Sequence, residues 1–126
     1  MQMRSSLGRV RGLGTAKEGV QHWWAQRATA VALIPLAVWF LASIICLMGG
    51  TRAELVAWLG SPFSAGLMIL FLLALFWHAL LGMQVVIEDY VHHEGRKLAA
   101  LFAVKGLILV LAAASVASVI KLMLQG

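Results

Sequence analysis

The chain has 126 residues, of which 62% are hydrophobic and 12% charged, and its mean hydropathy is +0.92. A soluble domain carries about 25% charged residues, so this composition excludes a soluble catalytic domain. The net charge of +5 comes from basic residues that flank apolar stretches and form no run, which favours membrane topology over nucleic-acid binding. The single cysteine, Cys46, excludes a disulfide framework, a CxxC motif and a CxxCH haem attachment.

Charged residues are missing from long intervals of the sequence. None occurs within residues 28–51 or 55–87, and Lys105 is the only one within residues 98–120. Each interval is near or above the ~20 residues that a membrane-spanning helix needs. The sequence therefore predicts an all-α membrane protein with three transmembrane helices.

The first part of the chain, residues 1–24, is a basic segment with glycines and serines. It contains no apolar core of signal-peptide length, so we expect it to be retained as a cytoplasmic tail. Trp23 and Trp24 mark the membrane interface, where indole rings are common. Residues 25–126 are expected to form the three-helix transmembrane domain.

The three spans are expected at about residues 28–48, 63–87 and 98–120. Pro35 lies inside the first span and should kink it, because proline removes one backbone hydrogen bond. Between the first two spans, residues 52–58 can form a short interfacial helix.

Lysine and arginine are divided unevenly between the two sides of the membrane. Seven lie on the side of the N-terminus and two on the far side, so the positive-inside rule places the N-terminus in the cytoplasm. Lys105 lies inside the third span, can extend toward the cytoplasmic side, and receives no function. The residues on the N-terminal side are Arg4, Arg9, Arg11, Lys17, Arg27, Arg96 and Lys97, and those on the far side are Arg52 and Lys121.

His78 lies within the second span, at the start of the segment HALLGMQVVIEDY. It stands eleven residues before Asp89, about 16 Å along a helix, which is roughly half of a ~30 Å hydrocarbon core. The histidine is therefore expected near mid-membrane, either as a haem ligand or as a neutral side chain bonded to a neighbouring helix. Gly82, one turn further on the same face, would leave a slot for a macrocycle.

One intramembrane histidine supplies one axial ligand, so a six-coordinate haem would need its second ligand from another chain. The other histidines, His22, His92 and His93, lie at the expected cytoplasmic rim and are too far away to serve.

Three further residues at the cytoplasmic rim are candidates for a binding site. Tyr90 can donate a hydrogen bond to a quinone carbonyl, and Asp89 can hold a basic partner in place. Arg27 can reach an acidic group such as a haem propionate. Each also has a plain interpretation: an interfacial cap for the aspartate, a belt aromatic for the tyrosine, and an arginine that fixes helix depth.

Three motifs together resemble those of the smaller hydrophobic membrane anchor subunits of succinate dehydrogenase (respiratory complex II) in bacteria and related mitochondria. They are QRATA at residues 26–30, HALLGM at residues 78–83, and the pair Asp89–Tyr90. The resemblance covers nearly the whole chain. It implies half of a heterodimeric anchor bundle in the bacterial inner membrane, in a complex that passes electrons from succinate to ubiquinone.

The resemblance also implies roles for individual residues. His78 is similar to the axial ligand of haem b. Tyr90 is similar to the phenol that bonds ubiquinone, with Asp89 as its acidic neighbour that organises the quinone site. Arg27 is similar to the arginine near the haem propionates and the quinone pocket.

The implied partners are a cytochrome b-type second anchor subunit that supplies the other haem ligand, an iron–sulfur subunit, a flavoprotein subunit and membrane lipid, with no nucleic acid. The chain would then be a non-flavin subunit of an enzyme and not catalytic alone, since the redox chemistry belongs to the cofactors.

Two other functions stay open. One is the anchor of a fumarate reductase-type complex, which runs the reaction in the other direction. The other is a purely structural anchor or assembly protein without a cofactor, in which a change at His78 would leave spectra and quinone reduction intact. A b-type cytochrome working alone would need two mid-membrane histidines, and the sequence has one.

Overall fold

The computed structural model describes residues 15–125, and all the regular secondary structure in this range is helical. The predicted all-α class is therefore confirmed. The basic residues Arg4, Arg9 and Arg11 lie outside the described residues. The helices are α2 (Thr15–Leu47), α3 (Arg52–Gly60), α4 (Pro62–Tyr90) and α5 (Glu94–Gln125).

Three of the described helices are long and apolar enough to cross a membrane, as the charge-free intervals predict. Each helix continues beyond its interval at one end or at both. For example, α2 begins at Thr15, so residues 15–24 of the expected tail are helical, and its 33 residues extend over about 50 Å. Adding a residue to an existing helix costs far less than starting one, so the turns persist past the apolar stretch.

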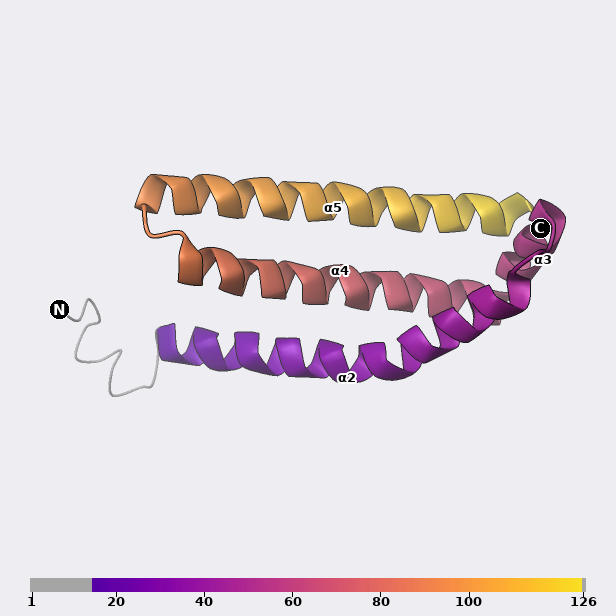
Figure 1. Cartoon of the computed structure of the whole chain (residues 1–126), viewed down its shortest axis with the longest axis horizontal. Coiled ribbons are helices and arrows are strands. Elements are labelled where there is room, and N and C mark those ends of the chain that lie inside the picture. The colour runs from indigo at the N-terminus through magenta and orange to yellow at the C-terminus, as the bar shows by residue number, and fades with distance from the viewer. Residues whose placement is uncertain (1–14, 126) are drawn as a thin grey trace.

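The long helices run alternately up and down, with α4 between α2 and α5 (Figure 1). Helix α4 packs against both neighbours, and α3 packs across the end where α5 finishes. Figure 1 also shows that α2 bends partway along its length. Pro35 lies inside α2 and accounts for this bend, since sharp kinks occur chiefly at proline.

Local signals in the sequence explain the turn between α2 and α3. Gly49 has a φ of +80°, the left-handed conformation that commonly ends a helix and that glycine adopts without steric cost. Thr51 and Glu54 then form a reciprocal capping box at the start of α3.

A proline and a histidine mark the starts of the other two long helices. Pro62 opens α4, where its missing N–H costs nothing. At the start of α5 the backbone N–H of Arg96 donates to Nδ1 of His93 at 3.3 Å, so His93 satisfies one of the unpaired N–H groups of the first turn.

The buried core lies toward the α3 end of the bundle. It brings together residues of all four described helices, and stacked aromatic pairs, Trp39 with Trp58 and Phe40 with Phe71, extend it. The opposite end, where α4 finishes and α5 begins, lacks such a cluster among the described residues. The core residues are Leu36, Leu59, Met68, Phe71 and Val119.

Candidate functional site in the central helix

His78 is held between two of the long helices. It is half-buried on α4, and its Nδ1 lies 3.0 Å from the hydroxyl oxygen of Thr29 on α2. It follows Pro62 by sixteen residues and precedes Tyr90 by twelve, so about 24 Å and 18 Å of helix separate it from the two ends of α4. The structure thus places this imidazole deep within the central helix, with one ring nitrogen engaged by its own chain.

Thr29 is itself firmly placed. Only 5% of its surface is exposed, and its hydroxyl lies 2.8 Å from the carbonyl oxygen of Ala25 and 3.1 Å from that of Gln26. This threonine belongs to the QRATA motif, and the sequence predicted no role for it. The feature that could have indicated its role is a polar side chain within an apolar span, since a hydroxyl in a spanning helix often bonds to a neighbouring helix.

The same face of α4 contacts α2 further along. Phe71, two helical turns before His78, stacks on Phe40 of α2 with ring centroids 4.9 Å apart. Phe71 and His78 therefore both lie along the seam between α2 and α4.

Gly82 borders open space. A Cβ built at this position meets no atom within 4 Å outside its immediate helical surroundings, so the chain leaves the space beside it unfilled. Because Gly82 follows His78 by four residues, the two lie one turn apart on neighbouring parts of the same face. The haem-facing slot expected at Gly82 stays a prediction.

Arg27 lies apart from His78. It is exposed, and its guanidinium carbon lies 5.4 Å from the centroid of the Trp23 ring, in a cation–π contact. Arg27 stands two positions before Thr29, which places its side chain about 200° round the helix from that of Thr29. The structure therefore holds Arg27 on a different face of α2 from the Thr29–His78 contact.

Asp89 and Tyr90 lie at the C-terminal end of α4. Both are exposed, with 77% of the tyrosine surface accessible. Their carboxylate and phenol are therefore open to a ligand or a partner at the end of the bundle where α2 begins and α5 begins.

His22 lies on the same face of α2 as Thr29, two turns nearer the N-terminus, which is about 10 Å along the axis. Its Nε2 is buried and has no hydrogen-bond partner among the described residues. Within the described range, no group of three or more His, Cys, Asp or Glu side chains comes together as a metal site would require.

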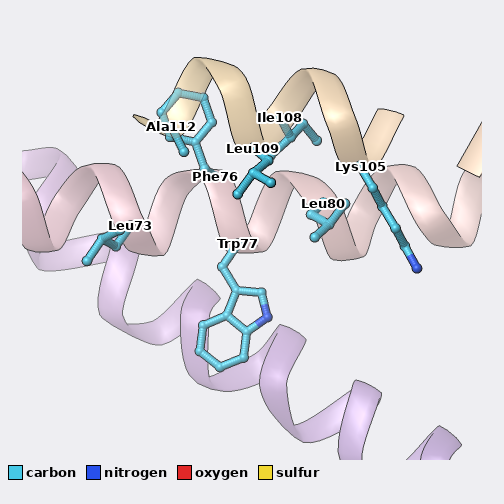
Figure 2. Close-up of a pocket in the computed structure, with 8 residues that line it drawn as sticks. All are labelled: Leu73, Phe76, Trp77, Leu80, Lys105, Ile108, Leu109 and Ala112. Carbon is cyan, nitrogen blue, oxygen red and sulfur yellow. The ribbon is translucent and has the colours of Figure 1, made fainter. Parts of the chain in front are cut away.

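A second surface feature is an apolar groove between α4 and α5. Figure 2 shows Lys105 extending from α5 with its nitrogen at the edge of this groove, and His78 is not part of the lining. The lining residues are Leu73, Phe76, Trp77, Leu80, Lys105, Ile108, Leu109 and Ala112.

The fold and the site define a class of protein. This is a multi-pass helical membrane subunit with a histidine inside its central span, and at most 17% of the residues in each apolar window are buried by the chain itself. Such exposed apolar helices require lipid or other subunits around them.

Comparison with known proteins identifies the family. The succinate dehydrogenase/fumarate reductase transmembrane subunit family matches residues 1–119. The succinate dehydrogenase hydrophobic membrane anchor subunit of Paracoccus denitrificans is 38% identical over 93 residues, which cover 74% of this chain and 72% of the relative. The succinate dehydrogenase membrane anchor subunit of Reclinomonas americana is 32% identical, covering 71% and 77%. The hydrophobic anchor subunit of Rickettsia bellii is 31% identical, covering 81% and 82%. The chain therefore belongs to the succinate dehydrogenase/fumarate reductase transmembrane subunits, and among them to the membrane anchors of succinate dehydrogenase.

Proposed function

We propose that this chain ligates haem b through His78, together with a second anchor subunit, and helps to form the site where ubiquinone is reduced with electrons from succinate. One observation carries the proposal. The His78 ring lies deep within α4 with Nδ1 engaged by Thr29, whereas no residue in the described part of the chain bonds its Nε2. That nitrogen is the one available to an iron atom.

The residues around His78 fit a haem. The open space beside Gly82 would let a flat ring approach the helix backbone. When bound, the haem would supply a one-electron redox centre inside the membrane. His78 would bind the iron, and the partner anchor would supply the second ligand.

The end of α4 suits a quinone site. Tyr90 is exposed there and can donate one hydrogen bond to a quinone carbonyl, and Asp89 can order basic groups of a neighbouring subunit. We propose that this end faces the cytoplasm of a bacterium, where the iron–sulfur and flavoprotein subunits would dock. Electrons from succinate would then reach the quinone from the same side.

The direct test of the haem proposal is a reduced-minus-oxidised optical spectrum of the complex purified from membranes. We expect a b-type band, with one haem for each copy of this chain by pyridine haemochrome assay. A complex that contains all its subunits and oxidises succinate, but shows no such band, would contradict the proposal.

Replacing Tyr90 with phenylalanine tests the quinone site. The substitution keeps the ring and removes a single hydrogen-bond donor, worth about 1 kcal/mol, so kcat/KM for ubiquinone should fall roughly fivefold. The measurement is succinate-dependent quinone reduction by the purified variant complex.

Two controls accompany this variant. Succinate oxidation with a soluble dye should be unchanged, because the dye takes electrons before the quinone site, and the haem spectrum should also be unchanged. Loss of the haem band in Tyr90→Phe would refute separate haem and quinone roles, and normal quinone kinetics would refute the hydrogen bond.

A further inference from the structure

We infer that Thr29 is a positioning residue for His78: its hydroxyl oxygen accepts the Nδ1–H of the imidazole and thereby keeps the Nε2 lone pair free for iron. This inference rests on the proposed haem ligation by His78. The observation behind it is the 3.0 Å contact between Thr29 Oγ1 and His78 Nδ1, which joins α2 to α4.

The proposed direction of the Thr29–His78 hydrogen bond follows from where the single hydroxyl hydrogen of Thr29 goes. Thr29 has one hydroxyl hydrogen, and the carbonyl oxygen of Ala25, at 2.8 Å, is its shortest acceptor. In the proposed arrangement the hydroxyl hydrogen is directed to this carbonyl oxygen, and an oxygen lone pair is directed to the ring. The imidazole then carries its proton on Nδ1, and Nε2 is left as the unprotonated nitrogen.

The placement of Thr29 makes this bond a constraint on the ring. Only 5% of the threonine surface is exposed, and its hydroxyl is bonded to a backbone carbonyl of its own helix four residues back. Rotating the imidazole would break the contact with α2 and leave a polar nitrogen unpaired in an apolar surrounding. Thr29 therefore selects both the tautomer and the orientation of the ring.

The expected consequence concerns the electronic character of the ligand. A hydrogen bond from Nδ1–H makes an imidazole a more basic ligand, and such outer partners typically change metal affinity 10–100-fold when removed. A more basic ligand favours ferric over ferrous iron. Loss of the Thr29 hydroxyl should therefore raise the midpoint potential of the haem.

The experiment compares Thr29→Val with Thr29→Ser in the purified complex by redox titration of the haem band. Valine keeps the shape and removes the hydroxyl, and serine keeps the hydroxyl. We expect Thr29→Val to lower the preference for ferric haem about tenfold, a rise of ~59 mV for one electron, and Thr29→Ser to stay near the wild type.

Ser43→Ala is the matched control. Ser43 also lies on α2 and donates to the carbonyl four residues back, at 2.8 Å from Trp39, so its loss removes the same kind of backbone bond without touching His78. Its haem potential should equal that of the wild type. Should Thr29→Val fail to assemble, Thr29→Ala removes the hydroxyl with less volume and carries the same expectation.

The outcomes separate the inference from the proposed function. If His78→Ala leaves the haem band unchanged, the haem proposal itself is wrong. If His78→Ala removes the band while Thr29→Val and Thr29→Ala leave the potential unchanged, haem ligation stands and the role of Thr29 is refuted. A rise of equal size in Thr29→Ser would also refute it, because packing and not the hydroxyl would then be responsible.

Discussion

Replacing His78 with alanine is expected to remove the b-type band from the purified complex. The substitution deletes the Nε2 atom that we propose as the iron ligand. Removing an outer partner of a ligand already costs 10–100-fold in affinity, so removing the ligand should lower haem affinity by more than about 100-fold. The measurement is haem content per complex, with the optical spectrum of whatever haem remains.

Two variants make this result interpretable. His92→Ala removes an exposed histidine from the turn between α4 and α5 and should leave haem content unchanged. His78→Met offers iron a thioether in place of imidazole, so haem should be retained in part, with a raised potential, because methionine ligation favours the ferrous state.

Assembly has to be measured beside the spectrum. Size-exclusion chromatography and dye-linked succinate oxidation report whether the soluble subunits remain attached to the anchor. An assembled His78→Ala complex with an unchanged band would show that the iron is held elsewhere. It would favour the alternative of a structural anchor for this chain.

Filling the space beside Gly82 is expected to have the second-largest effect. Gly82→Leu adds a side chain where a Cβ meets nothing within 4 Å, so the chain itself should tolerate it. A haem in that space would be overpacked, and overpacking costs about 1–3 kcal/mol, a fall of roughly 5- to 150-fold in haem affinity. The readout is haem content, with Gly82→Ala expected to give a smaller loss.

Gly66→Leu is the matched control on the same helix. A Cβ at Gly66 also meets nothing within 4 Å, and the residue lies twelve positions before His78 and about 120° round the helix. Both substitutions replace glycine in a helix interior and should raise helix propensity by about 0.8–1 kcal/mol. Equal haem loss in both variants would show a general packing defect and contradict a haem-facing role for Gly82.

The fold could be predicted largely from the distribution of charge. Three intervals without charged side chains, apart from Lys105, predicted three spans, and each predicted span overlaps one long helix, α2, α4 or α5. The reason is that hydrocarbon excludes unpaired charges and demands internally bonded backbone, which only a helix supplies within one segment. The helix ends were less predictable, because helices continue past the apolar stretch once formed. Thus α2 begins at Thr15, well before the expected span.

The candidate site divides in the same way between sequence and structure. Local spacing was enough to select His78, Gly82, Asp89 and Tyr90, since these residues lie on one helix whose period is known. The partner of the imidazole could not be selected in this way. Thr29 is 49 residues away in the sequence, and its contact with His78 exists only because α2 packs against α4 in one particular register. The composition and periodicity of the chain thus determined which helix carries the candidate ligand His78. The packing of two helices decided which of its ring nitrogens contacts Thr29, because a hydrogen bond between spans depends on their relative depth and rotation.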